Sequence, residues 1–256
     1  DAASMNYEEA VVVMSELDVV GGYADGSFNP QAGLTRGAAA KIICNMILGP
    51  TTAAALSASS APFSDVPADS VFAGYITYCA KEGIINGYAD GTFRPTAPLT
   101  GYAFAKMLLG ALGYDADIEG YTGANWSVNV AKQALGIDMD AGIEEFKGTA
   151  FVNRETACQM ALNTLKATMV EYDAKTTVTV NGAQVVVGGS KANEVSQSGY
   201  KDSMGKSFLQ FAEKYFTNLT TKPTTDAFER PATEWKVGKK VVGVFADEAD
   251  FSYDAK

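Results

Sequence analysis

Two arginines carry the clearest chemistry in this 256-residue chain. The chain has only four arginines, and Arg36 and Arg154 each directly follow a residue that can cap a helix, Thr35 and Asn153. A cation at a helix start opposes the helix dipole and costs about 0.3–1 kcal/mol, so it must be retained for another reason. A guanidinium binds a carboxylate through two parallel hydrogen bonds, which lysine cannot do. The pattern therefore predicts contact with an acidic ligand, or a salt bridge to Asp25 or another loop carboxylate.

The chain contains no histidine, which removes most catalytic arrangements. Nucleophiles activated by histidine and almost every zinc site are excluded, leaving carboxylates, lysine and tyrosine. The segment 115–120 resembles the start of a calcium loop, but Trp126 stands where the ligating glutamate is required. We expect no metal, no cofactor and no catalytic residue. A glycosidase with two carboxylates is the enzymatic alternative, and no motif marks such a pair.

The three cysteines form an odd and widely spaced set. Cys44, Cys79 and Cys158 lie on apolar faces of expected helices, which predicts buried core thiols. A disulfide or a metal role is the alternative.

The composition limits the possible partners. The formal net charge is −10 and the lysines are scattered, which argues against a nucleic-acid partner. No apolar run approaches 18 residues, so no membrane span is expected. An acidic polymer could be bound only locally, through Arg36, Arg94, Arg154 and a few lysines, and such binding is expected to weaken with salt.

A repeated stretch organises the elements that position these residues. Residues 22–35 and 87–100 share ten of fourteen positions at a spacing of 65 residues. Asp25-Gly26 and its counterpart Asp90-Gly91 are turn dipeptides, and apolar residues at helical spacing lie before and after each turn. Repetition of this kind indicates a modular array in which each copy is helix, turn loop, helix.

The expected helices of the first two copies cover residues 6–20 and 71–82 before the turns, and each second helix follows its capping threonine. The linker 50–62 is rich in small residues and is predicted to be a loop. A third, divergent copy is expected at an offset of 53, with helices over 126–135 and 153–167.

After about residue 171 the pattern changes. Asn181-Gly182 and Gly238-Lys239 are each flanked by β-rich segments, and this predicts two hairpins. An amphipathic helix is expected near Ser207–Leu219. We therefore expect a mainly α fold of three helix-loop-helix repeats, followed by a small α+β segment. The expected boundaries are 1–50, 61–115, 116–170 and 171–256.

These motifs resemble the surface-layer homology (SLH) repeat of bacterial cell-envelope proteins. The resemblance rests on the F-x-D-V lead-in at Phe63–Val66, the G-I-x-x-G-Y-x-D-G-T-F-x-P turn that starts at Gly83, and the L-T-R helix start at 34–36, and covers roughly residues 1–170. It implies a pseudo-threefold bundle whose grooves bind secondary cell-wall polysaccharide, often pyruvylated. It also implies an extracellular location at a Gram-positive wall, with a signal peptide expected upstream of Asp1.

The resemblance also implies which residues contact the ligand: Arg36, Arg154, Thr35, Asp65, Trp126, Gly22 and Gly87. Gly101 replaces the arginine of the second copy, so that groove is expected to have lost its charge. Core packing is the alternative for Trp126, and a turn-forming role is the alternative for Gly22 and Gly87.

We therefore expect a non-catalytic wall-anchoring module. The alternative outside catalysis is a structural protein that assembles a surface layer through protein contacts, with residues 171–256 or exposed faces of the bundle as the contact surface.

Overall fold

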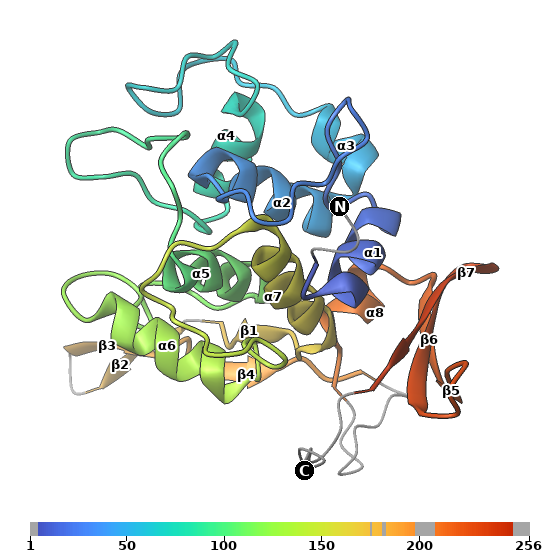
Figure 1. Cartoon of the computed structure of the whole chain (residues 1–256). Helices are drawn as coiled ribbons and strands as arrows, with labels where there is room; N and C mark the ends of the chain where they lie inside the picture. The colour runs from blue at the N-terminus through green and yellow to red at the C-terminus, as the bar shows by residue number, and fades with distance from the viewer. Residues whose placement is uncertain (1–4, 175, 181–182, 198–207, 248–256) are drawn as a thin grey trace.

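The computed structural model describes residues 5–174, 176–180, 183–197 and 208–247, and three pairs of helices occupy its first two thirds (Figure 1). The repeated sequence pattern predicted these pairs, and we call them repeats one, two and three. The pairs are α1 (Glu8–Glu16) with α2 (Arg36–Leu48), α4 (Ala73–Lys81) with α5 (Gly101–Leu112), and α6 (Trp126–Gly136) with α7 (Arg154–Lys166). None of the described helices is long and apolar enough to cross a bilayer.

The turn loops of repeats one and two form as predicted. The Asp25 carboxylate accepts hydrogen bonds from the backbone N–H and the hydroxyl of Ser27, at 2.9 and 2.7 Å. Asp90 makes the same two bonds with Thr92, at 3.0 and 2.6 Å. Gly91 follows with a φ of 79°, which a residue with a Cβ rarely adopts. These aspartates form turns, as the sequence indicated.

The second helix of each repeat begins at the predicted cap. The side chains of Thr35 and Thr100 accept hydrogen bonds from the backbone N–H groups of Ala38 and Ala103, both at 3.3 Å. Asn153 accepts the equivalent bond from Thr156 at 2.8 Å. The three helices α2, α5 and α7 are therefore launched by the same local chemistry.

A closed ring of backbone hydrogen bonds joins the three repeats. The N–H of Leu34 donates to the carbonyl of Val152 (2.9 Å), that of Leu99 to Leu34 (3.0 Å), and that of Val152 to Leu99 (3.0 Å). All three residues are buried. The second helix of each repeat also packs against the first helix of the next repeat, α2 on α4, α5 on α6, and α7 on α1. The expected mainly α, pseudo-threefold bundle is confirmed.

The cysteines are buried and free, as predicted for core thiols. Burial raises the pKa of Cys158 to about 12, which is the behaviour of an unreactive thiol.

The prediction that 50–62 is entirely loop was wrong at its start. A short helix, α3 (Pro50–Ala54), begins directly after Gly49 and buries Ala53 completely. Proline at the first helical position lacks only an N–H that would be unpaired there anyway, so it favours the start of a helix. The rest of the linker has no helix or strand.

The C-terminal segment contains antiparallel strands and one helix, as expected. Strand β1 (Val170–Tyr172) pairs with β4 (Ala192–Glu194), and β2 (Thr176–Val180) with β3 (Ala183–Val187). The pairing of Val180 with Ala183 confirms the first hairpin, although Asn181-Gly182 lies outside the described residues. The second hairpin is confirmed around Gly238-Lys239, between β6 (Pro231–Val237) and β7 (Lys240–Ala246).

The expected helix near Ser207–Leu219 is shorter than predicted, and Ser207 lies outside the described residues. The helix α8 spans only Phe211–Tyr215, because Leu219 already begins strand β5 (Leu219–Thr225). The sequence did not predict β5, since its threonines and Pro223 do not alternate with apolar residues. The strand lies at the edge of the β5-β6-β7 sheet, where proline is tolerated.

The C-terminal segment packs against the repeats (Figure 1). The indole N–H of Trp235 donates to Glu9 of α1 at 2.6 Å, and the Lys240 amine pairs with Glu16 at 2.7 Å. Phe211 is completely buried, and its backbone N–H donates to the carbonyl of Ala167 at 2.9 Å. Through these contacts β6, β7 and α8 form one unit with the helices.

Candidate functional site

Arg36 binds the turn loop of the next repeat. Its Nε donates to the carbonyl of Phe93 at 2.7 Å, and its Nη2 donates to the carbonyl of Asn86 at 3.2 Å. The guanidinium carbon lies 4.3 Å from the ring centre of Phe93 and 5.0 Å from that of Tyr88. The first side chain of α2 is thus held against repeat two by hydrogen bonds and aromatic rings.

Arg154 makes the equivalent contacts between repeats three and one. Its Nε donates to the carbonyl of Phe28 at 2.9 Å, and its Nη2 to the carbonyl of Gly21 at 2.7 Å. The guanidinium carbon lies 4.4 Å from the ring centre of Phe28 and 5.2 Å from that of Tyr23. The two arginines are therefore structurally equivalent.

Neither arginine forms an ion pair with any residue that the structure describes. Arg94 does pair, with Asp90 at 2.9 Å, but it lies outside the two helix starts. The internal salt bridge that the sequence left open for Arg36 and Arg154 is thus not formed within the described part of the chain. Each guanidinium binds neutral carbonyls and keeps three further N–H groups.

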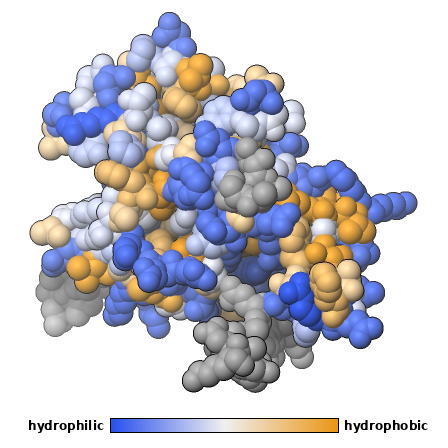
Figure 2. Space-filling view, in the orientation of Figure 1, coloured by the Kyte–Doolittle hydropathy of each residue, from blue (hydrophilic) through white to orange (hydrophobic). Residues whose placement is uncertain are grey.

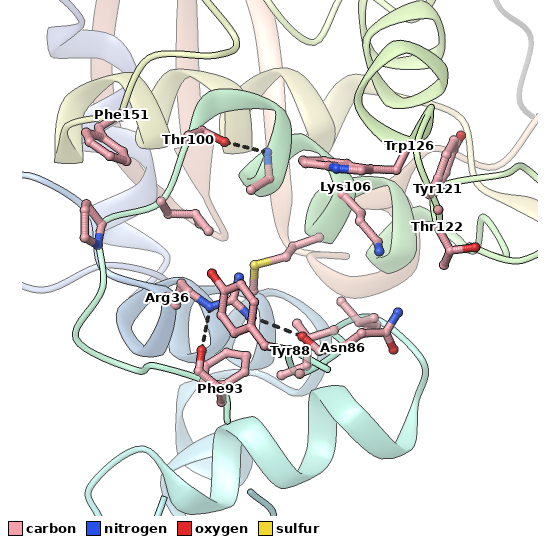
Figure 3. Close-up of a pocket in the computed structure, with 18 residues that line it drawn as sticks. Arg36, Asn86, Tyr88, Phe93, Thr100, Lys106, Tyr121, Thr122, Trp126 and Phe151 are labelled. Carbon is pink, nitrogen blue, oxygen red and sulfur yellow. Dashed lines mark hydrogen bonds between the residues drawn. The ribbon is translucent and has the colours of Figure 1, made fainter. Parts of the chain in front are cut away.

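A cavity of about 540 Å³ lies beside Arg36 and is lined by all three repeats (Figure 3). It brings together three of the predicted ligand residues, Arg36 from repeat one, Gly87 from repeat two and Trp126 from repeat three. Among the residues that the structure describes, Arg36 and Lys106 are the only charged ones in its lining, and no carboxylate contributes to it.

Lys106 was missed by the sequence analysis. Figure 3 shows its side chain extending from α5 between Trp126 on one side and Tyr88 with Arg36 on the other. Burial lowers the pKa of Lys106, and the positive charge of Arg36 lowers it further, while Asp117 opposes the change. A signal was available, because Lys41 and Lys106 recur at the 65-residue spacing of the doubled turn.

The remaining predicted residues lie elsewhere. Thr35 caps α2 and is absent from the lining of the cavity beside Arg36, where its counterpart Thr100 stands instead. Gly22 belongs to the turn loop beneath Arg154, next to Gly21. A Cβ at Gly22 would lie 2.9 Å from the carbonyl oxygen of Ser27, so the turn itself requires this glycine.

Asp65 holds the turn of repeat two in place. Its two carboxylate oxygens accept hydrogen bonds from the backbone N–H groups of Phe93 and Arg94, both at 2.7 Å. Burial by itself would raise the pKa of Asp65, but these two hydrogen bonds outweigh it and lower the pKa below its ordinary value. Asp65 therefore positions the Phe93 carbonyl that Arg36 binds.

This arrangement predicts a loss of stability in acid. A carboxyl whose pKa is lower in the folded chain stabilises it fully above the ordinary value of 3.8, and this contribution is lost as the pH falls below that value. We expect the urea midpoint to be constant between pH 7 and 5 and to fall below about pH 4. The Asp65→Asn variant is expected to have a lower urea midpoint at pH 7, and its midpoint is expected to fall less over the same acid range. A parallel pH profile of the two proteins would contradict this role for Asp65.

The start of α5 has a glycine, Gly101, in place of an arginine, and the described residues around it leave no space for a side chain. A Cβ on Gly101 would lie 2.9 Å from the Cα of Gly148 and 3.0 Å from the Phe146 ring. Phe146 also packs edge-on against Tyr102, with 6.1 Å between ring centres. The turn of repeat three thus closes directly over the helix start, where the other two turns hold an arginine.

Comparisons with known proteins agree with this geometry. Residues 1–40 and 62–105 match the S-layer homology domain. The chain is 39% identical over 89 residues to Cell surface glycoprotein 1 of Acetivibrio thermocellus, covering 34% of this chain and 4% of that protein. It is 26% identical over 160 residues to the Surface layer protein of Brevibacillus choshinensis, covering 60% and 14%.

A third relative is the Cellulosome-anchoring protein of Acetivibrio thermocellus, 36% identical over 86 residues that cover 34% of this chain and 19% of the relative. The alignments thus span only a small part of each of these three proteins. Together with the family match, they show that this chain carries S-layer homology domains at residues 1–40 and 62–105.

Proposed function

We propose that this chain is a non-catalytic module that anchors a protein to the bacterial cell wall by binding an anionic wall polysaccharide in grooves between its repeats. We place it outside the cell, at the cell surface. The names of the relatives, which include a cellulosome-anchoring and a surface layer protein, support an anchoring role. We also propose repeat boundaries at 1–50, 61–115 and 116–170, with 171–256 as an α+β C-terminal segment.

The cavity beside Arg36 is the observation that carries this proposal. The chain as a whole has 30 acidic and 20 basic residues, yet the lining of this cavity contains two cations and no acid. Two positive charges that form no ion pair with a described residue favour an anionic ligand in this groove. A net negative chain can therefore bind an anionic polymer at this place.

The same cavity offers surfaces for a sugar ring. The indole of Trp126 and the ring of Tyr88 both contribute to the lining, and aromatic faces stack on the apolar faces of sugars. The free N–H groups of Arg36 can bind a carboxylate, such as that of a pyruvyl ketal or a uronate. An acidic sugar unit therefore fits the chemistry of this lining better than a neutral one.

Co-sedimentation with purified Gram-positive wall sacculi tests the proposed function. We expect the chain to sediment with intact sacculi and to stay in the supernatant with sacculi from which the secondary polysaccharide has been extracted. Equal sedimentation with both preparations, or none with either, would contradict the proposal.

Lys106 provides a test of the site. Replacing Lys106 with glutamine removes one of the two cations from the cavity and keeps most of the side chain's length, so binding to wall polymer is expected to weaken by about 5- to 10-fold. Lys132→Gln, an exposed lysine on α6, is the matched control and is expected to bind as the parent does. An equal loss of binding in the two variants would show a general effect of net charge and would contradict the site.

A second candidate function, assembly of a surface layer through protein contacts, rests on the C-terminal sheet. Val241 and Val244 of β7 are 48% and 42% exposed, and β7 is an edge strand of its sheet. Figure 2 shows hydrophobic side chains gathered over this part of the molecule. An apparent molecular mass from light scattering that rises with protein concentration, and does not rise in Val241→Lys/Val244→Lys, would support this function. An apparent mass that is constant with concentration would exclude it.

A further inference from the structure

Two thiols meet at the seam between repeats one and two. Cys44 of α2 and Cys79 of α4 are both completely buried, and their sulfur atoms lie 3.6 Å apart. The third cysteine, Cys158 of α7, is also buried and free. The pair belongs to neither the cavity beside Arg36 nor the contacts of the C-terminal segment.

The two side chains point across the seam toward each other. The Cys44 sulfur lies 3.6 Å from the carbonyl oxygen of Tyr75, one helical turn before Cys79. The Cys79 sulfur lies 3.7 Å from the carbonyl oxygen of Ala40, one turn before Cys44. Cysteines whose side chains point apart cannot be bridged without backbone movement, and these two reach the opposite helix.

Only a small movement separates this pair from a disulfide. The sulfur atoms of a disulfide are about 2.05 Å apart, so the two sulfurs must approach by about 1.5 Å. Rotation about the two Cα–Cβ bonds and a slight shift of α2 against α4 together supply a movement of this size.

We propose that Cys44 and Cys79 form a redox site that closes into a disulfide when the chain folds in the presence of a low-molecular-weight disulfide. The thiolate of one cysteine attacks a sulfur of the small disulfide, which gives a mixed disulfide and releases one small thiol. The second cysteine then attacks the protein sulfur and releases the second small thiol. The protein pair loses two electrons and two protons, and the small disulfide gains both.

The surroundings of the two cysteines determine when the disulfide can form. The contact with Cys44 and burial both raise the pKa of Cys79, so the reactive thiolate is scarce in the folded chain. Thiol–disulfide exchange is therefore confined to the period of folding before α2 and α4 pack against each other. Once the seam has closed, the disulfide is protected from small reductants by the same burial.

A disulfide here would act on the groove that Arg36 forms. Arg36 is the first residue of α2, and the segment after α4 supplies Asn86 and Tyr88 to its surroundings. Tying α2 to α4 fixes these two sides of the groove relative to each other. It also closes the loop that contains α3 and the linker, which restricts the unfolded chain.

Refolding of a Cys158→Ala variant tests this inference, and the result does not depend on wall binding. After refolding from denaturant with oxidised and reduced glutathione, followed by alkylation, we expect an unalkylated chain about 2 Da lighter than the reduced form. Peptide mapping is expected to show a link between Cys44 and Cys79. The melting temperature is expected to rise by about 5 °C or more over that of the reduced chain.

A matched control adds Cys44→Ser to this variant, and it is expected to give no internally linked product. Two alkylated thiols in the refolded Cys158→Ala chain would overturn the inference. A linked form that melts below the reduced form would also overturn it.

Discussion

Replacing Arg36 and Arg154 together with alanine is expected to abolish binding to cell wall. Each arginine begins the second helix of its repeat and lies against the turn of the following repeat. Both remain without an ionic partner among the described residues, so both charges stay available to an anionic ligand. A charge-assisted hydrogen bond contributes about 1.5–3 kcal/mol, so the loss of two such sites lowers affinity by at least 100-fold.

The single variants are expected to differ. Arg36 lines a cavity that also contains Lys106 and Trp126, so Arg36→Ala is expected to weaken binding by itself by about 10-fold or more. Arg36→Lys keeps the charge but loses the planar contact with two carbonyls and two rings, and is expected to recover binding only in part.

Arg230→Ala is the matched control for these variants. Arg230 pairs with Asp226 at 2.6 Å in the C-terminal segment, far along the chain from the turn loops. This variant is expected to sediment with sacculi as the parent does. Each variant's melting temperature must be measured, because the arginines also hold the turns. Normal sedimentation of a folded Arg36→Ala/Arg154→Ala chain would contradict the site.

The largest effect on stability is expected for Glu155→Ala. Glu155 lies near the start of α7 and is 1% exposed. Its carboxylate accepts hydrogen bonds from the backbone N–H and the side-chain amide of Asn6, both at 2.8 Å, and from the Gln31 amide at 2.6 Å. These bonds tie repeat three to the segment before α1 and to the turn of repeat one.

Removing this carboxylate leaves three donors without their acceptor. An unsatisfied buried polar group costs about 1–3 kcal/mol, and relaxation lets some of these donors reach water, so we expect unfolding free energy to fall by about 3 kcal/mol. Glu155→Gln keeps an acceptor oxygen, so its free energy of unfolding is expected to fall by less. Urea unfolding measures both, with the exposed Glu145→Ala as control. A loss of less than about 1 kcal/mol for Glu155→Ala would show that the ring closes without this contact.

The parts of this fold that were predictable depend on local chemistry. The Asp-Gly turns, the capping residues Thr35, Thr100 and Asn153, and the Gly238-Lys239 hairpin each follow from a few neighbouring residues. The doubled turn then revealed which local units are equivalent. The equivalence of Arg36 and Arg154 was visible for the same reason.

Contacts between repeats were not predictable from these patterns. The sequence placed Arg36 and Arg154 at helix starts, but the carbonyls that each one binds belong to another repeat and become neighbours only when the ring closes. The same holds for Glu155, whose partners are 124 and 149 residues away. A pattern read along one segment carries no information about such distances.

Polar side chains were also difficult to assign between structure and function. Asp65 was expected to contact ligand, and the sequence did not reveal that both of its oxygens also bind backbone N–H groups of the turn. Lys106 was overlooked because a lysine on an amphipathic helix is usually solvent-exposed, and its recurrence with Lys41 at the repeat spacing does not by itself place it beside Arg36 and Trp126. The strand β5 was missed because a polar edge strand need not alternate with apolar residues.

The central claim is that the grooves recognise the acidic groups of a wall polymer. The most direct measurement is the affinity of the chain for purified secondary wall polysaccharide, by titration calorimetry, before and after chemical removal of pyruvyl groups or reduction of uronate carboxyls. We expect the native polymer to bind and the neutralised polymer to bind at least about ten-fold more weakly. Equal affinity for the two polymers would contradict the claim.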